Sequence, residues 1–198
     1  MKKIFAVTIV LASVLWSCKK DQPEVSKPET PGKSVKVLKN LLEHNEIVDT
    51  VLIANVNEFE VGMRFYSSTS GKITHLGCKM PSAGKYKVSL WDYGSKQLLA
   101  SAVLDNYPDQ FTYADITDIP AIANQRFVIS IHTVVEGAKR PYYISRKKSS
   151  SASVYPFTAG NIVFEALHSK VSPVSVFPDA ITQSNQSLVA GYPDIIFQ

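Results

Sequence analysis

Cysteine and histidine are scarce in this chain of 198 residues, and each shortage removes one way of building a domain or a site. The two cysteines, Cys18 and Cys78, allow one disulfide at most, so a framework of several disulfides is excluded. The histidines are too far apart in the sequence to show the paired spacing of zinc ligands. They are His44, His75, His132 and His168.

A strong excess of charge is also lacking. The formal net charge of +4 falls by two, to +2, if Lys2 and Lys3 are removed with a leader. A nucleic-acid surface would need clustered basic residues, and the one such cluster, residues 146–148, precedes three serines and is typical of a solvated loop. We therefore predict no nucleic-acid partner.

Catalytic motifs are missing as well. The sequence has no Gly-x-x-x-x-Gly-Lys phosphate loop, no Gly-x-Gly-x-x-Gly fingerprint, no Gly-x-Ser-x-Gly elbow and no His-Glu-x-x-His helix. Glycoside hydrolysis needs two facing acids, and no spacing in the sequence requires such a pair. The best calcium candidate is Asp105, Asn106 and Asp109, which an ordinary polar turn explains better. We predict a non-enzymatic protein without a metal or a cofactor.

Only one continuous hydrophobic run is present, at residues 4–15, and it is too short to span a bilayer. It follows Lys2 and Lys3 and ends just before Ser17 and Cys18, which is the pattern of a signal peptide covering residues 1–17. The ending resembles the lipobox of bacterial lipoproteins, although Trp16 departs from its usual small or aliphatic residue. The resemblance implies that Cys18 is lipidated; the alternative is an ordinary cleaved signal.

Residues 18–34 contain prolines and charges but few apolar side chains, so they predict an extended tether rather than folded structure. No aspartate follows Cys18 directly, so the inner-membrane retention signal of Gram-negative lipoproteins is missing. We therefore expect an outer-membrane, lipid-anchored protein on the periplasmic or the cell-surface side. With Cys18 acylated, Cys78 has no disulfide partner, and its phase with Leu76 and Met80 predicts a buried apolar role.

The rest of the chain has the pattern of a β domain. Residues 35–46 form a lead-in that is either a short helix or irregular, and the domain proper covers residues 47–198. Short runs of β-branched and aromatic residues alternate with turn residues. They predict strands at 47–53, 59–66, 72–80, 85–92, 97–104, 110–116, 126–133, 140–145, 161–166, 171–177 and 192–197.

No amphipathic helix of ordinary length separates these runs, which excludes parallel βαβ units. Antiparallel strands at this spacing predict an all-β fold, a two-sheet β-sandwich of jelly-roll type. In the closing strand Ile195 and Phe197 share one phase while Ile196 has the other, so we expect it to be covered on both faces and paired centrally.

Several short motifs follow one another along the chain in the order of a known domain family. They are Glu60-Val61-Gly62-Met63-Arg64-Phe65, Tyr86-Lys87-Val88-Ser89-Leu90-Trp91, Leu98-Leu99-Ala100, Phe127-Val128-Ile129-Ser130-Ile131-His132-Thr133 and Asp194-Ile195-Ile196-Phe197. The series resembles a β-sandwich domain family of secreted bacterial proteins that has no settled activity and often lies beside carbohydrate-active and adhesion modules. Residues 108–118 depart from it, since the family usually has a tryptophan-containing strand there. The resemblance implies a sandwich fold and a binding or display role.

One face of the predicted sheet has the composition of a ligand site. Sugars offer apolar faces to aromatic rings and hydroxyls to polar groups, and two strands carry both kinds of residue in the phase opposite the core. The strand that follows would add a tyrosine. The candidate ligand-binding residues are Ser89, Trp91, Ser130, His132, Tyr142 and Tyr143. The alternative for Trp91 is that it covers the inner sheet or packs under a loop with its indole N–H satisfied locally, and the alternative for His132 is a satisfied histidine at a strand end.

Two functions fit this sequence. The first is a lipid-anchored, non-catalytic module of the cell envelope that binds a glycan or another envelope component. The alternative is an accessory or structural subunit that docks onto an outer-membrane complex through sheet edges and an apolar patch.

Overall fold

The computed structural model describes residues 34–43, 49–53, 57–147, 153–181 and 186–198. The predicted signal peptide, the lipidation of Cys18 and nearly all of the tether therefore lie outside the described residues, as does His44. Among the described residues, no helix combines the length and hydrophobicity that crossing a membrane requires.

Strands make up most of the described chain. The single α-helix of these residues is α1 (Val37–Glu43). The strands are β1 (Val35–Lys36), β2 (Asp49–Ile53), β3 (Phe59–Ser67), β4 (Gly71–Lys79), β5 (Gly84–Asp92), β6 (Leu98–Asn106), β7 (Phe111–Ala121), β8 (Arg126–His132), β9 (Val134–Val135), β10 (Ala138–Lys139), β11 (Tyr142–Arg146), β12 (Phe157–Ala159), β13 (Ile162–Val171), β14 (Leu188–Ala190) and β15 (Pro193–Phe197).

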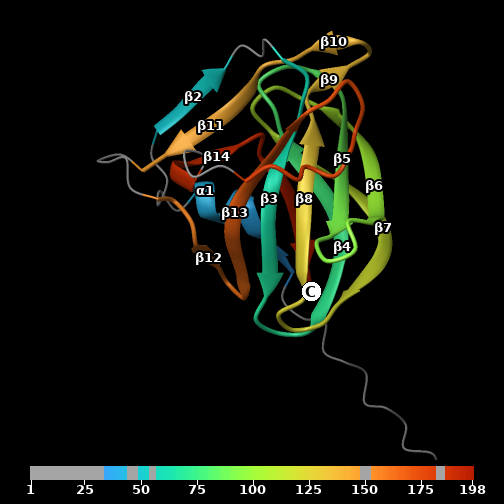
Figure 1. Cartoon of the computed structure of the whole chain (residues 1–198), viewed down its shortest axis with the longest axis vertical. Coiled ribbons are helices and arrows are strands. Elements are labelled where there is room, and N and C mark those ends of the chain that lie inside the picture. Colours follow the sequence, from blue (N-terminus) through green and yellow to red (C-terminus); the bar gives the residue numbers. More distant parts are fainter. Residues whose placement is uncertain (1–33, 44–48, 54–56, 148–152, 182–185) are drawn as a thin grey trace, which may run out of the picture. The chain divides into compact units, whose positions relative to one another are not determined.

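All strand pairs are antiparallel. The largest sheet has the order β12-β13-β3-β8-β5-β6, and a second has the order β1-β15-β4-β7 (Figure 1). A three-stranded sheet, β14-β11-β2, and the hairpin of β9 and β10 complete the fold. The predicted all-β, antiparallel fold is confirmed.

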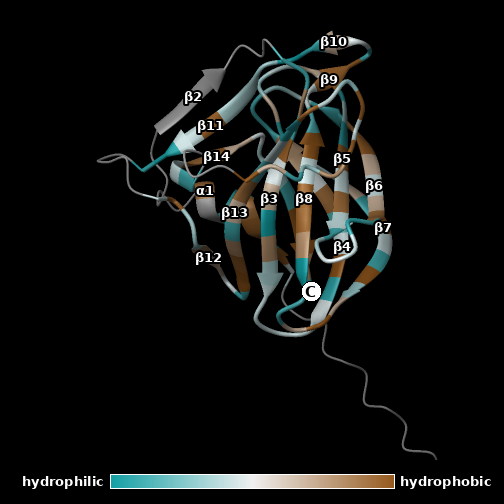
Figure 2. Ribbon diagram, viewed as in Figure 1, coloured by the Kyte–Doolittle hydropathy of each residue, from teal (hydrophilic) through white to brown (hydrophobic). Residues whose placement is uncertain are grey.

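The two larger sheets share one hydrophobic core, which makes the domain a sandwich. Met63 of β3 and Ile129 of β8 belong to the same buried cluster as Leu76 of β4 and Ile195 of β15. Strand β8 is hydrophobic along most of its length (Figure 2) and buried from Phe127 to His132. A strand that is buried on both sides must have something covering its outer face as well.

Strand β15 lies between β1 and β4, and all five of its residues are buried. The predicted central position of the closing strand is confirmed. Its Asp194 caps α1, because the two carboxylate oxygens accept hydrogen bonds from the backbone N–H groups of Leu38 (2.7 Å) and Lys39 (3.0 Å). The hydroxyl of Tyr113 donates a further bond at 2.7 Å.

The folded unit extends further towards the N-terminus than residue 47. Of the two alternatives for residues 35–46, the structure has the short helix α1, whose Val37 and Leu38 are completely buried in the core. Strand β1 adds Val35 and Lys36 to the edge of β15. Cys78 is also completely buried, as its phase predicted, and burial raises the pKa of its thiol to about 12.

One predicted strand is wrong. Residues 172–177 do not form a strand; β13 ends at Val171, and the chain then continues irregularly to Ile181. Pro173 and Pro178 lack the N–H group that a sheet ladder needs, although the residues between them alternate as in a strand. We call residues 172–181 the covering segment, since their orange-red trace crosses in front of β3 and β8 in Figure 1.

Candidate functional site

The candidate ligand-binding face on β5 and β8 exists in the structure, but it is covered and not open to solvent. Strands β5 and β8 are neighbours, and Ser89 is paired directly with Ser130. The indole Nε1 of Trp91 donates a hydrogen bond to the Ser130 hydroxyl at 2.8 Å. The two strands therefore lie side by side, which the candidate face requires, and His132 lies on the same face of β8 as Ser130.

The covering segment buries these four side chains. The hydroxyls of Ser89 and Ser175 lie 3.3 Å apart, and the Nε2 of His132 is 3.2 Å from the carbonyl oxygen of Ser172. The Trp91 ring packs edge-on against Phe177 at 6.0 Å. Trp91 is only 8% exposed, so its ring holds the covering segment rather than forming a free platform.

Tyr142 and Tyr143 do not join this face, and that part of the prediction is wrong. Their strand, β11, pairs with β2 and β14 in the separate three-stranded sheet. Tyr142 packs edge-on against Phe59, and Tyr143 stacks on Tyr192 with ring centroids 5.3 Å apart. The sequence showed that β11 follows β8 along the chain but contained no signal that the chain changes sheets between them.

A carboxylic acid lies at the centre of the buried cluster. Glu60 of β3 is completely buried, and its Oε1 accepts a hydrogen bond from Ser130 at 2.5 Å, while Oε2 has no aligned donor among the described residues. Burial raises the pKa of Glu60 from its ordinary 4.5 to about 7, against the opposing effects of nearby Ser130, Ser175 and Lys87.

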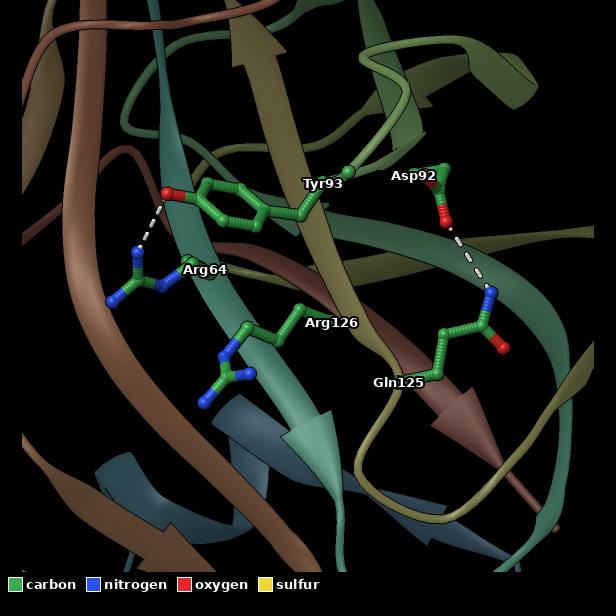
Figure 3. A pocket seen from close by; sticks show the side chains of 6 residues that line it. Arg64, Asp92, Tyr93, Gln125 and Arg126 are labelled. Atoms are coloured by element: carbon green, nitrogen blue, oxygen red, sulfur yellow. Dashed lines mark hydrogen bonds between the residues drawn. The ribbon is translucent and has the colours of Figure 1, made fainter.

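An open hollow of about 510 Å³ lies beyond the covered region, on the same sheet (Figure 3). We call it the arginine hollow. The strand ends of β3, β5 and β8 and the turns beside them contribute its lining, which is Arg64, Asp92, Tyr93, Gly94, Gln125 and Arg126. Its volume is within the range of about 300–1,000 Å³ that is common for small-ligand pockets.

Two arginines and one glutamate form the charged side of this hollow. The guanidinium of Arg126 donates to both carboxylate oxygens of Glu165, with Nε–Oε2 at 2.9 Å and Nη2–Oε1 at 3.1 Å. Arg64 places its Nε 2.8 Å from Glu165 Oε2, as an ion pair without an aligned hydrogen bond. Glu165 is the extra residue of a β-bulge in β13, which directs its side chain between the two arginines.

The opposite side of the hollow holds an ionised acceptor. Asp92 Oδ1 accepts from the backbone N–H of Ser95 at 2.7 Å and from its hydroxyl at 2.9 Å. These bonds hold the pKa of Asp92 below its ordinary value, chiefly through the backbone N–H. The amide of Gln125 donates to Asp92 Oδ2 at 3.3 Å, so both planar groups are oriented before a ligand arrives.

Tyr93 provides the aromatic wall of the hollow. Its backbone N–H donates to the carbonyl of Arg126 at 3.1 Å, which ties the turn after β5 to the start of β8. Its hydroxyl accepts from Nη1 of Arg64 at 2.9 Å, and its ring lies 4.8 Å from the Arg64 guanidinium carbon (Figure 3). The ring is half-buried, so it is held in place and still has exposed surface.

These residues are not among the predicted ligand-binding residues, although the sequence contains part of the signal for them. Arg64 is four positions after Glu60 and Arg126 is four before Ser130, so both arginines share the face of the buried cluster. Tyr93 lies in the Tyr-Gly-Ser turn after β5 and had no periodicity to mark it. Both arginines could have been found by considering charged residues, as well as aromatic ones, at the strand positions whose side chains point away from the core.

Metal chemistry has little support in the described residues. No three of their His, Cys, Asp or Glu side chains come together as metal ligands would. In the calcium candidate loop, the amide of Asn106 is buried and donates to the carbonyls of Met80 (3.1 Å) and Ser82 (2.9 Å). Asp105 and Asp109 are both exposed, so the loop does not gather three ligands.

A scan against family models and a search of curated proteins both found no match. The case for a function therefore depends on the site itself.

Proposed function

We propose that this protein is a non-catalytic, lipid-anchored module of the cell envelope and that its sandwich binds a glycan in the arginine hollow. The observation that carries the proposal is the composition of the hollow: one aromatic wall and four planar polar side chains around an open volume of about 510 Å³. The lipid anchor and the outer-membrane location are supported by the lipobox resemblance at Cys18.

The polar groups suit a polyol. Arginine presents donors only, an ionised aspartate presents acceptors only, and an amide presents both. Neighbouring ring hydroxyls can donate to one such group and accept from the next. Asp92 and Gln125 are already fixed by their mutual hydrogen bond, and Arg126 is fixed by Glu165. The protein therefore loses little side-chain entropy when a ligand binds.

The aromatic wall suits the other side of a sugar. The C–H face of a pyranose ring is apolar and stacks on a flat aromatic surface. Tyr93 offers such a surface, and its contacts with Arg64 hold the ring in one orientation.

The acids of the hollow support binding over hydrolysis. A glycosidase needs a general acid whose pKa is raised, so that it keeps its proton at neutral pH. The pKa of Asp92 is shifted in the opposite direction, and Glu165 is ion-paired with Arg64 and Arg126. Both are suited to the role of a fixed hydrogen-bond acceptor.

Binding of the purified protein to a glycan array, followed by calorimetry with the polysaccharides retained, tests the proposal. We expect Tyr93→Ala to weaken affinity about fivefold or more, since stacking on an aromatic ring contributes about 1 kcal/mol or more. Tyr93→Phe keeps the ring and should bind within a few-fold of the wild type.

Tyr107→Ala is the matched control, because Tyr107 is 63% exposed and does not line the hollow. Equal affinity of the Tyr93→Ala protein and the Tyr107→Ala protein for every retained glycan would refute the site, and retention of none would refute the function.

The second candidate function is docking to an envelope protein. Leu98, Leu99 and Val103 are exposed on β6, which is an edge of the six-stranded sheet, and Val103 is 62% exposed. Apolar side chains along a sheet edge favour association with another protein. Co-purification of a stoichiometric membrane protein that is lost in Val103→Asp would favour this candidate over the glycan.

A further inference from the structure

A second hollow, of about 310 Å³, adjoins the arginine hollow. We call it the histidine hollow. The two share Tyr93 and Gly94 as lining residues, so they lie side by side and the tyrosine separates them. The other residues that line the histidine hollow are Lys96, His168, Phe177, Asp179 and Ile181.

The covering segment builds one wall of this second hollow. Phe177 contacts Tyr93 and Trp91 with ring centroids 6.5 and 6.0 Å away, and Lys96 Nζ lies 5.7 Å from its ring centre. Two backbone hydrogen bonds between Ser169 and Ala180, at 3.0 and 3.1 Å, hold the end of the segment against β13. The wall is therefore fixed, and half-buried Phe177 provides a second aromatic surface next to Tyr93.

His168 lines this hollow as a neutral, buried ring. Its Nδ1 is 2.8 Å from the carbonyl oxygen of Pro178, which only accepts, so Nδ1 carries the proton and Nε2 has a lone pair. His168 is 99% buried, and its Nε2 has no hydrogen-bond partner among the described residues. Burial lowers the pKa of this histidine, so the ring is neutral at pH 7.

We propose that the two hollows are adjacent subsites for one uncharged oligosaccharide of at least two sugar units, with Tyr93 between them and Phe177 as the second stacking surface. This inference rests on the proposed function of the arginine hollow and adds the length and the charge of the ligand. A second aromatic ring beside the first offers the next sugar unit an apolar surface of its own.

The charges argue for an uncharged ligand. Arg64 and Arg126 are matched by Glu165, and Asp92 adds a second negative charge. In the histidine hollow the lining has one cation, Lys96, and one anion, Asp179, and the positive charges of Lys170 and Lys96 both lower the pKa of Asp179. An acidic sugar would have to displace Glu165 or approach Asp92, and both cost electrostatic energy.

Calorimetry with the purified protein tests this with ladders of one to six units of cello-, malto-, manno- and N-acetylated chito-oligosaccharides, and with oligogalacturonate as the acidic comparison. We expect affinity in the recognised ladder to rise at least tenfold between one unit and two or three, then to level off. Oligogalacturonate should bind at least tenfold more weakly at the same length.

Variants separate the two subsites. Phe177→Leu keeps an apolar side chain in the covering segment but removes the aromatic surface, so it should abolish the gain in affinity with length. Phe111→Leu, the same substitution in a stacked pair with Tyr113 in the other sheet, is the control and should keep the gain. A Lys96→Ala protein should still favour the neutral ladder.

The outcomes distinguish this inference from the proposed function. Equal affinity for one unit and for longer chains would overturn the second subsite while leaving the arginine hollow intact. Tighter binding of oligogalacturonate, weakened by salt, would overturn the uncharged ligand. Binding of none of the ladders, after a negative glycan array, would overturn both.

Discussion

Replacing Glu60 with glutamine should change how the stability of the fold depends on pH. Glu60 is completely buried beneath the covering segment, and desolvation raises its pKa to about 7 from an ordinary 4.5. Between these two values the unfolded chain has released its proton while the folded chain still binds it. The free energy of unfolding therefore falls as the pH rises through this window and is constant above it.

The magnitude follows from the shift. One pKa unit corresponds to about 1.4 kcal/mol, so a change from 4.5 to about 7 removes about 3 kcal/mol of stability between pH 4.5 and pH 8. That is a large part of the 5–15 kcal/mol typical of a whole domain. Glutamine is uncharged throughout and can still accept the hydrogen bond from Ser130, so the variant should not lose this stability.

Urea denaturation of both proteins at several pH values measures the effect. The difference in the free energy of unfolding, Glu60→Gln minus wild type, should grow by about 3 kcal/mol from pH 4.5 to pH 8. Glu136→Gln is the control, because Glu136 is exposed in the turn between β9 and β10. A Glu60→Gln difference that stays constant with pH, or grows towards low pH, would show that Glu60 is ionised in the folded state.

Two further predictions concern the fold and the anchor. Asp194→Ala removes the acceptor for the N–H groups of Leu38 and Lys39 and for the hydroxyl of Tyr113, so it should cost about 3–5 kcal/mol of unfolding free energy in urea denaturation. A loss below 1 kcal/mol would contradict this role. Cys18→Ser should move the protein from the detergent phase to the aqueous phase, because each buried CH₂ of a lipid chain contributes about 0.8 kcal/mol to membrane binding. Unchanged partitioning would refute the lipid anchor.

The strands could be predicted because a two-sided environment leaves a period of two in the sequence. In β3, β5 and β8 the core-facing residues are apolar at every second position, and all three strands lie where the alternation placed them. The same rule failed at residues 171–177, where the burial of successive side chains does not alternate and Pro173 lacks the N–H group that a sheet ladder needs. A short alternation of apolar and polar residues is therefore not sufficient evidence for a strand when a proline interrupts it.

The shared phase of Ser89 and Ser130 was accessible to sequence reasoning, whereas the pairing of their strands was only a condition and the cover over them was not foreseen. Strands β5 and β8 are separated in the chain by β6 and β7, and the position of residues 172–181 depends on a few specific contacts. Three of these are the hydrogen bonds of His132 and His168 to segment carbonyls and the packing of Trp91 on Phe177. Contacts of this kind have no repeat that a sequence pattern could reveal.

The location of the candidate site follows from where that cover ends. On the outer face of the sheet, β3 carries Glu60 and then Arg64, separated by Gly62, and β8 carries Ser130 and then Arg126, separated by Val128. The covering segment seals the first of each pair and leaves the second open. The alternation of residues along a strand shows which side chains lie on the outer face of the sheet. It does not show where that face changes from buried to open. That boundary lies at Tyr93, whose ring contacts both Phe177 of the cover and Arg64 of the open hollow, and substitution of this residue is therefore the most direct test of the site.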